Sequence, residues 1–158
     1  MDVVACPHHP QPAPDYAPFA FVDTDELFRR ADVVSLHCPL TEETRGLVCA
    51  RTLALMKPGG IVINTSRGAV CRSADVADAL RSGHLAAFGA DVLEQEPPGE
   101  DDPLLSAPNT LLTPHLAWAT DGARQRIIDI TVENIRRFLE GRPQNVVNPQ
   151  REEGRPAQ

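Results

Sequence analysis

The chain has 158 residues, the length of one ordinary domain. Hydrophobic residues make up 42% of it, which is close to the globular average, so the composition supports a buried core and excludes a disordered chain. Against 15 basic residues there are 22 acidic ones, and the net charge of -7 argues against nucleic acid or an anionic membrane as a main partner.

The sequence contains neither an apolar run long enough to span a membrane nor the basic and apolar segments of a secretory signal near its start. We therefore expect no membrane span and a cytoplasmic location. The chain has four cysteines, Cys6, Cys38, Cys49 and Cys71. They form no C-x-x-C motif, and none is spaced from a histidine as in a zinc finger. We expect reduced thiols and no metal site.

Turn residues and short apolar runs divide the beginning of the chain. Residues 2–6 (DVVAC) predict a strand, and the five prolines of residues 7–18 predict a loop. Asp23 and Glu26 have the spacing of a capping box, so a short helix is expected to follow as far as about Arg30.

Three further elements are predicted in the middle of the chain. Residues 32–37 (DVVSLH) predict a strand that is apolar nearly throughout, as in a sheet covered on both faces. Residues 50–56 predict a helix that ends at the Lys-Pro-Gly-Gly of residues 57–60. Residues 61–64 (IVIN) predict another strand.

The same alternation continues after this strand. Ser73 is expected to cap a helix that runs to about Ser82 and is closed by Gly83. Three segments follow it: a strand at 86–92, an acidic, proline-rich loop at 94–108, and a short strand at 110–112.

A long helix is predicted near the end of the chain, from about Thr120 to Glu140, where Gly141 ends it. Its apolar stripe has helical spacing and consists of Ile128, Val132, Ile135 and Leu139. Residues 150–158 form a polar tail that we expect to be frayed.

The repeated change from strand to helix predicts an α/β fold with a doubly wound, Rossmann-like parallel sheet. In such sheets ligands bind at the carboxyl ends of the strands, near the point where the strand order reverses. The residues that directly follow each strand are therefore the first candidates for a site.

Residues with reactive or charged side chains follow the predicted strands in the sequence. In chain order they are Cys38, Arg67, Asp91 and His115, with Glu96 shortly after Asp91. A guanidinium can bind a carboxylate with two hydrogen bonds. A histidine can exchange a proton near neutral pH, and a carboxylate behind it fixes its tautomer. Taken alone, each of these residue types is more often part of a surface ion pair, a solvated charge or a loop hydrogen bond than of a catalytic site.

The combination of motifs is more specific than any one residue. The segments, in chain order, are ADVVSLHCPLTEETRGLV, LALMKPGGIVINTSRGAV, LAAFGADVLEQEPP and NTLLTPHLAWAT. Over about residues 2–149 the chain closely resembles the D-isomer-specific 2-hydroxyacid dehydrogenases. The segment PHLAWAT at 114–120 is most similar to the branch of glycerate dehydrogenases and hydroxypyruvate reductases.

The resemblance implies a catalytic role for three residues. Arg67 would bind the substrate carboxylate and polarise the neighbouring carbonyl, His115 would be the general acid and base, and Glu96 would be its charge partner. Hydride would pass between the substrate C2 and a nicotinamide. A formate dehydrogenase fits less well, because a neutral amide would be expected there in place of Glu96.

The resemblance also implies cofactor contacts and leaves the cofactor open between NAD and NADP. Asp91 would meet the nicotinamide end. The other positions that match dinucleotide contacts are Cys38, Thr65, Ser66, Arg67, His115 and Trp118. Relatives often carry an acidic residue for the adenosine ribose where this chain has Pro7, so the preference between the two cofactors is not predicted.

One part of the family pattern is missing from the sequence. The dinucleotide fold of the family begins one strand earlier, with a G-x-G-x-x-G turn that binds the pyrophosphate, and the chain contains no such motif. We expect residues 1–149 to be a partial NAD(P)-binding domain that lacks its first strand and glycine-rich turn.

Two functional readings remain open. In the first, the chain is part of an oxidoreductase for a small D-2-hydroxy acid or 2-oxo acid such as glycerate or hydroxypyruvate, homodimeric when complete and inactive as the isolated chain. In the second, it is a non-catalytic, dinucleotide-sensing or interaction module of the corepressor type, or an inactive truncated product. The catalytic set does not discriminate between them, because such corepressors can keep it.

Overall fold

The computed structural model describes residues 1–7, 9 and 11–148, and the chain divides into two compact units, Met1–Leu116 and Ala117–Gln158. Within the residues described, no helix combines the length and the apolar character that a membrane crossing requires.

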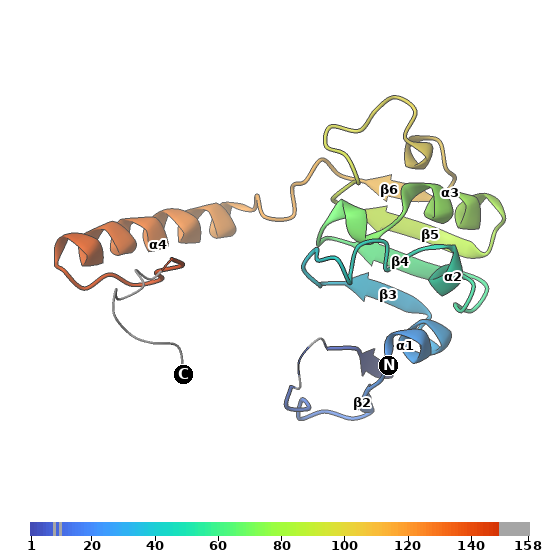
Figure 1. Ribbon diagram of the computed structural model, residues 1–158, viewed down its shortest axis with the longest axis horizontal. Helices are drawn as coiled ribbons and strands as arrows, with labels where there is room; N and C mark the ends of the chain where they lie inside the picture. The colour runs from blue at the N-terminus through green and yellow to red at the C-terminus, as the bar shows by residue number, and fades with distance from the viewer. Residues whose placement is uncertain (8, 10, 149–158) are drawn as a thin grey trace, which may run out of the picture. The chain divides into compact units, whose positions relative to one another are not determined.

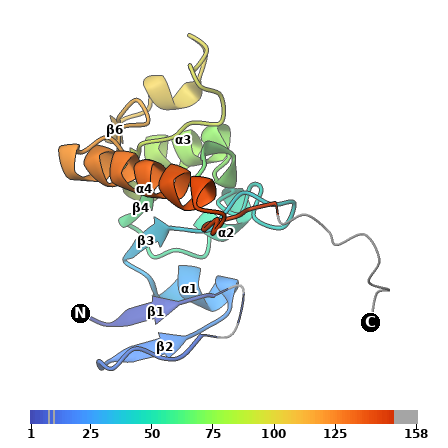
Figure 2. The same ribbon diagram turned by 90° about the vertical axis from the view of Figure 1, so that its left-hand side faces the viewer.

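The first unit begins with a small parallel sheet of two strands, β1 (Val3–Ala5) and β2 (Phe19–Phe21), which lie side by side in Figures 1 and 2. β1 confirms the strand predicted at 2–6. β2 was not predicted, because a run of three residues is too short to show a period. Its Phe19 ring stands edge-on to the rings of Tyr16 and Phe21, with centroids 5.6 and 4.9 Å apart.

Helix α1 (Thr24–Arg30) confirms the capping pattern read from the sequence. The Asp23 carboxylate accepts the backbone N–H of Glu26 at 2.8 Å, as an N-cap residue should. Phe28 points from α1 into the main core and is almost fully buried.

A four-stranded parallel sheet forms the body of the first unit (Figure 1). Its strands are adjacent in chain order: β3 (Val33–Leu36), β4 (Gly60–Asn64), β5 (Leu85–Ala90) and β6 (Thr110–Leu112). The strands predicted at 32–37, 61–64 and 110–112 are confirmed, and the one predicted at 86–92 ends two residues earlier. The parallel α/β fold is therefore confirmed.

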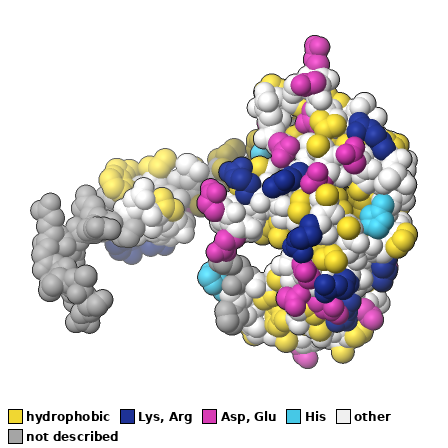
Figure 3. Space-filling view, turned by 45° about the vertical axis from the view of Figure 1, so that its right-hand side comes forward, with side chains coloured by type: hydrophobic (Ala, Val, Ile, Leu, Met, Phe, Trp, Pro, Cys, Tyr) yellow, Lys and Arg dark blue, Asp and Glu magenta, His cyan; other side chains and the backbone are white. Residues whose placement is uncertain are grey.

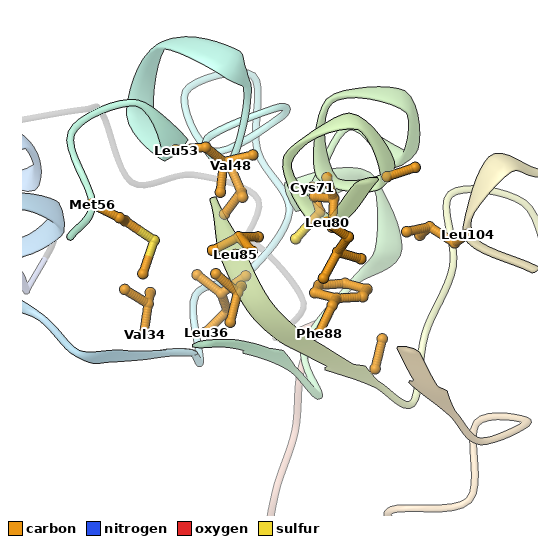
Figure 4. Packing of buried hydrophobic residues seen from close by; sticks show 14 of the residues in the cluster. Val34, Leu36, Val48, Leu53, Met56, Cys71, Leu80, Leu85, Phe88 and Leu104 are labelled. Carbon is orange, nitrogen blue, oxygen red and sulfur yellow. The ribbon is translucent and has the colours of Figure 1, made fainter. Parts of the chain in front are cut away.

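Helices α2 (Ala50–Leu53) and α3 (Ser73–Arg81) pack against one face of this sheet and enclose the core (Figure 4). The strands contribute Val34, Leu36, Val62, Phe88 and Ala90, and the helices contribute Leu53, Val76, Ala77 and Leu80. Each large apolar side chain buried here stabilises the fold by about 1.5–3 kcal/mol relative to full exposure. α2 is shorter than the helix predicted at 50–56, although Met56 beyond its end is also buried.

The opposite face of the sheet carries exposed apolar side chains. Val33, Ile63 and Leu111 are 53%, 37% and 73% exposed. Within the first unit β3 therefore alternates exposed and buried residues, where the sequence predicted a strand that is buried on both faces. The physical reason is that α2 and α3 both pack on the same face of the sheet, and they leave its other face uncovered.

Helix α3 begins differently from its predicted start. Ser73 is its first helical residue, not its cap, and the Ser73 N–H is bonded by the Glu94 carboxylate at 3.2 Å. Capping thus comes from a residue far along the chain. Gly83, with a φ of +75°, lies just after the helix, as predicted.

The second unit contains α4 (Asp121–Leu139), which confirms the long helix predicted from about Thr120 to Glu140. The Thr120 hydroxyl accepts the Ala123 N–H at 3.3 Å and caps the helix. The predicted apolar stripe lies at least half exposed along it: Ile128, Val132, Ile135 and Leu139. The polar tail at 150–158 lies outside the described residues.

Candidate active site

The carboxyl ends of β4, β5 and β6 bring three loops to one edge of the sheet. Because the strands are parallel and adjacent, Thr65 follows β4, Asp91 follows β5 and Thr113 follows β6 at this same edge. Backbone hydrogen bonds continue the sheet beyond its last paired residues, since the Asp91 N–H donates to Asn64 O at 3.0 Å and the Thr113 N–H to Ala90 O at 2.9 Å. The loops are therefore held in register with one another.

A histidine and a glutamate from two of these loops are in contact. His115 Nδ1 lies 2.7 Å from Glu96 Oε2, and the two side chains are 46% and 38% exposed. The other carboxylate oxygen of Glu96 accepts the Leu93 N–H at 3.0 Å. The hydrogen bond from His115, helped by the one from Leu93, holds the pKa of Glu96 below its ordinary value, so this carboxylate stays charged at neutral pH.

The backbone of His115 has an uncommon conformation. Its φ is +56°, in the left-handed region that costs energy for any residue other than glycine. Its N–H is shared between the carbonyl oxygens of Asp91, at 2.9 Å, and Thr113, at 3.0 Å. The turn that presents the imidazole is thus tied to the end of β5.

Asp91 lies beneath this turn and is only 6% exposed. Its Oδ1 accepts the Leu116 N–H at 2.7 Å and the hydroxyl of Thr113. We predicted from the resemblance that Asp91 contacts the cofactor. The structure adds that its carboxylate binds the loop on both sides of His115.

Arg67 lies on the neighbouring loop, after β4, and is exposed. Its guanidinium donates to the Ser66 carbonyl oxygen at 2.7 Å, and no hydrogen bond joins it to the His115–Glu96 pair among the residues described. The backbone that follows it is placed closely, because a Cβ atom added to Gly68 would lie 1.8 Å from Leu93 O. The Arg67 loop therefore packs directly on the segment that leads to Glu96.

Asn64 organises the Arg67 loop, and the sequence analysis did not single it out. The residue is fully buried at the end of β4. Its Nδ2 donates to Arg67 O at 2.9 Å, and its Oδ1 accepts both the N–H and the hydroxyl of Ser66 at 3.0 Å. A polar side chain that ends an otherwise apolar strand was the signal in the sequence that could have indicated it.

Replacing Asn64 by aspartate should destabilise the protein. The change puts an oxygen where Nδ2 donates to Arg67 O and buries a charge without a donor on that side, so we expect the free energy of unfolding to fall by about 2 kcal/mol or more. Urea denaturation at neutral pH measures it, with the exposed Asn148→Asp as the matched control. Equal stability of the two variants would show that the Asn64 hydrogen bonds do not hold this loop.

The remaining predicted site residues have simpler surroundings. Cys38 is half-buried two residues after β3, and burial raises the pKa of its thiol, so it is protonated at neutral pH. Thr65 is exposed directly after β4. Trp118 belongs to the second unit and is largely exposed, so its role at the site stays a prediction. Glu94 caps α3, and Glu96 is the carboxylate that reaches His115.

The surface and the metal-ligating residues add two observations. Figure 3 shows basic and acidic side chains interspersed on the face of the first unit that it presents, unlike the continuous basic surface of nucleic-acid-binding proteins. Within the described part of the chain, no three His, Cys, Asp or Glu residues gather as they would around a metal ion.

Comparison with known proteins places the chain in a family. The family model "D-isomer specific 2-hydroxyacid dehydrogenase, NAD binding domain" matches residues 1–117. A hydroxypyruvate reductase of Blautia hydrogenotrophica is 45% identical over 148 residues, which are 94% of this chain and 46% of the relative. A glycerate dehydrogenase of Methylorubrum extorquens is 41% identical over 128 residues, 80% of this chain and 41% of the relative.

Solved structures agree with this placement. The D-isomer specific 2-hydroxyacid dehydrogenase of Lactobacillus delbrueckii ssp. bulgaricus, in its NAD complexed form, superposes with a TM-score of 0.83 at 28% identity, over 93% of this chain and 49% of that one. A Thermus thermophilus protein superposes with a TM-score of 0.82 at 41% identity, over 92% of this chain and 45% of that one. The chain thus spans about half the length of the relatives it matches. The resemblance read from the sequence is confirmed: the chain belongs to the NAD-binding domain family of the D-isomer specific 2-hydroxyacid dehydrogenases.

Proposed function

We propose that this chain is the part of an NAD(P)-dependent 2-hydroxyacid dehydrogenase that carries the acid–base pair. The reaction is hydride transfer between NAD(P) and a D-2-hydroxy acid or 2-oxo acid, with glycerate and hydroxypyruvate as the first substrates to test. The observation that carries the proposal is the 2.7 Å contact between His115 Nδ1 and Glu96 Oε2 at the carboxyl edge of a parallel sheet. Such an edge is where ligands bind in this class of fold.

His115 and Glu96 divide the proton chemistry between them. With Nδ1 directed at Glu96, Nε2 is the ring nitrogen that exchanges a proton with the substrate oxygen. The charged carboxylate stabilises the imidazolium, which donates to the nascent alkoxide in reduction. In oxidation the neutral imidazole accepts the hydroxyl proton, and the same carboxylate stabilises the cation that forms.

Arg67 is the residue that we assign to the substrate carboxylate. A guanidinium recognises a carboxylate through two parallel hydrogen bonds, which fixes the orientation of the adjacent C2. The guanidinium now donates to the Ser66 carbonyl, and a bound carboxylate would replace this contact with a stronger, charge-assisted one. Asn64 holds the backbone from which Arg67 extends, so the side chain can move while its base stays fixed.

The residues present fit one end of the cofactor. When bound, the nicotinamide supplies or accepts the hydride. Neutral donors and acceptors at the sheet edge, such as the Thr65 hydroxyl and the Cys38 thiol, suit the amide and ribose of that end, and we assign Ser66, Asp91 and Trp118 to the same contacts. No G-x-G-x-x-G occurs in the sequence, so its residues offer no comparable site for the pyrophosphate.

We also assign residues 1–149 to a partial NAD(P)-binding domain without its first strand. In support, β1–β2 and β3–β6 form two separate parallel sheets, and β1 and β3 each pair on one side only among the strands described. Parallel sheets in this class are normally continuous and covered on both faces. The complete enzyme is proposed to be a cytoplasmic homodimer.

The direct test is activity of the full-length enzyme. Purified protein is mixed with NADH or NADPH and either hydroxypyruvate or glyoxylate, and loss of the reduced cofactor is followed. Turnover that disappears in Arg67→Lys and His115→Ala supports the proposal. A wild-type protein that binds cofactor without reducing any 2-oxo acid would favour the corepressor-type sensing module.

The 158-residue chain by itself should bind NADH weakly and show no turnover. The polar residues at its sheet edge are those that we assign to the nicotinamide end of the cofactor. The N–H groups that bind the pyrophosphate in this class of fold belong to a G-x-G-x-x-G turn, which the sequence lacks. Titration of NADH fluorescence should show no saturation at micromolar protein, whereas the full-length enzyme should saturate. A low-micromolar dissociation constant for the isolated chain would contradict this assignment of the cofactor contacts.

A further inference from the structure

We infer that Thr113 is a positioning residue, which together with Asp91 holds His115 in the conformation that directs Nδ1 to Glu96. The inference rests on the proposed function and adds to it a residue that neither contacts substrate nor carries the proton. It is drawn from the hydrogen bonds around the turn at residues 113–116.

The turn needs an external support because its central residue is strained. A left-handed φ at a non-glycine residue costs of order 1–3 kcal/mol and persists only where the surroundings impose it. At His115 the φ is +56°, and the shared hydrogen bond from its N–H accounts for one side of that support. The direction of the His115 side chain also depends on the peptide units before and after this residue, so these must be prevented from rotating.

Asp91 supplies this hold from both sides of His115. The residue two positions before the histidine, Thr113, donates its hydroxyl to Oδ1, and the residue directly after it, Leu116, donates its N–H to the same atom. The main-chain oxygen of Asp91 accepts the His115 N–H itself. One nearly buried residue therefore binds three successive parts of the turn.

Thr113 is the member of this arrangement whose side chain connects the turn to the carboxylate. Its backbone N–H continues the β5–β6 pairing by donating to Ala90 O at 2.9 Å, so the Cα position is fixed by the sheet. From that position its hydroxyl donates to Asp91 Oδ1. The contact thus orders Asp91 Oδ1 at the point where Leu116 also binds it.

The consequence for catalysis is geometric. A proton-transfer group must lie within hydrogen-bond reach of its partner, and a displacement of about 1 Å can cost about 100-fold in rate. Without the Thr113 hydroxyl the turn keeps its sheet hydrogen bond but loses the lock on the carboxylate. The imidazole should then sample orientations in which Nδ1 no longer meets Glu96.

The experiment compares three variants, Thr113→Val, Thr113→Ser and Thr110→Val. The first removes the hydroxyl at nearly constant shape, and the second restores it. The third is the matched control, because Thr110 begins β6, the strand that Thr113 directly follows, and its hydroxyl donates to Ala107 O at 3.1 Å, away from the histidine turn. If Thr113→Val fails to fold, Thr113→Ala removes the same hydroxyl with a smaller side chain and carries the same expectation.

The first readout needs no cofactor. In the 158-residue chain, the imidazole Nδ1–H that is bonded to Glu96 should give a downfield proton resonance by NMR, assigned by its loss in Glu96→Ala. We expect this signal to disappear or broaden in Thr113→Val and to persist in Thr113→Ser and Thr110→Val. An unchanged signal in a folded Thr113→Val would overturn the inference.

The second readout is the kinetics of the full-length enzyme. Thr113→Val should lower kcat by about 10- to 100-fold with KM changed less than about threefold, and Thr113→Ser should restore most of the rate. A wild-type enzyme without activity would defeat the proposed function and leave the NMR result to decide the positioning role. Loss of folding in both Thr113→Val and Thr113→Ala would overturn the inference, since a purely structural role would then explain Thr113.

Discussion

Replacing Glu96 by glutamine in the full-length enzyme should lower kcat/KM for reduction of a 2-oxo acid by about tenfold across the neutral pH range. In the proposed reduction His115 donates a proton to the forming alkoxide, and the Glu96 carboxylate, 2.7 Å from Nδ1, holds the ring in place for that transfer. The lowered pKa of Glu96 means that its charge is present throughout the neutral range, so the effect of removing it extends over that range. Glutamine keeps the shape and an acceptor but removes the charge.

The size of the effect follows from the geometry. A hydrogen bond to a charged partner is stronger than one between neutral groups by about 1–2 kcal/mol, and we expect the low end because both side chains are about two-fifths exposed and solvent screens the pair. A loss of about 1.4 kcal/mol is a tenfold fall in rate. The lowered pKa of Glu96 also gives the sign of the pH dependence: the difference between wild type and Glu96→Gln should be largest where Glu96 is charged, and it should shrink as the pH falls toward the range in which this carboxylate is protonated.

Two further variants make the pH profile decisive. His115→Ala should lower kcat in both directions by about 10²- to 10⁴-fold at every pH, because the acid and base is removed altogether. Glu100→Gln, an exposed position in the same acidic loop, should leave kcat/KM unchanged in both directions. If kcat/KM of Glu96→Gln equals that of wild type at neutral pH, Glu96 does not act as the charge partner of His115.

The elements that the sequence predicted correctly are those whose signals are local. Asp23 and Glu26 are three residues apart, and the helix they predict begins where expected. The period of the apolar residues at 128–139 likewise located α4. The strand at 61–64 could be recognised because apolar residues run between turn residues, and it is an inner strand of the sheet.

The elements that it did not predict depend on contacts between distant residues. The start of α3 is bonded by Glu94, which lies 21 positions after Ser73, so a local reading chose Ser73 as the cap. The alternation of exposed and buried residues in β3 depends on which face of the sheet the helices cover. The residues of the strand alone do not indicate which face that is. β2 gains its stability from pairing with β1 across the proline-rich loop.

The candidate site shows the same division. Arg67, Glu96 and His115 could be proposed because they follow predicted strands and lie in motifs that resemble those of the family, and the Glu96–His115 contact joins residues 19 positions apart. The supporting residues, Asn64 and Thr113, have side chains that occur commonly in proteins. Their importance comes from the hydrogen bonds that they form in the folded structure. Their roles became apparent only from hydrogen-bond partners at the sheet edge.

Gly68 should be the least replaceable residue near the site, for a reason of space. A Cβ atom added there would lie 1.8 Å from Leu93 O, 1.9 Å from Leu93 C and 2.5 Å from Glu94 N. All three are backbone atoms, so no change of side-chain rotamer can relieve the overlap. In Gly68→Ala the Arg67 loop and the segment at 93–96 must therefore separate.

The separation should affect both stability and catalysis. Overpacking a well-packed site costs about 1–3 kcal/mol, and because this overlap is with backbone we expect Gly68→Ala to lower the free energy of unfolding by about 3 kcal/mol or more. The Leu93 N–H that orients Glu96 Oε1 at 3.0 Å moves with the displaced segment, so kcat of the full-length enzyme should fall as well. Urea denaturation and steady-state kinetics measure the two effects.

Gly89 provides the matched control. It lies in β5, and a Cβ atom added there would meet nothing within 4 Å, so Gly89→Ala should change the free energy of unfolding by less than about 1 kcal/mol. A Gly68→Ala protein as stable as Gly89→Ala would mean that the two loops can separate at little cost. The Leu93 N–H is the backbone group that binds the Glu96 carboxylate. If moving it has no effect, the 2.7 Å contact between Glu96 and His115 would have to be set by the histidine turn alone.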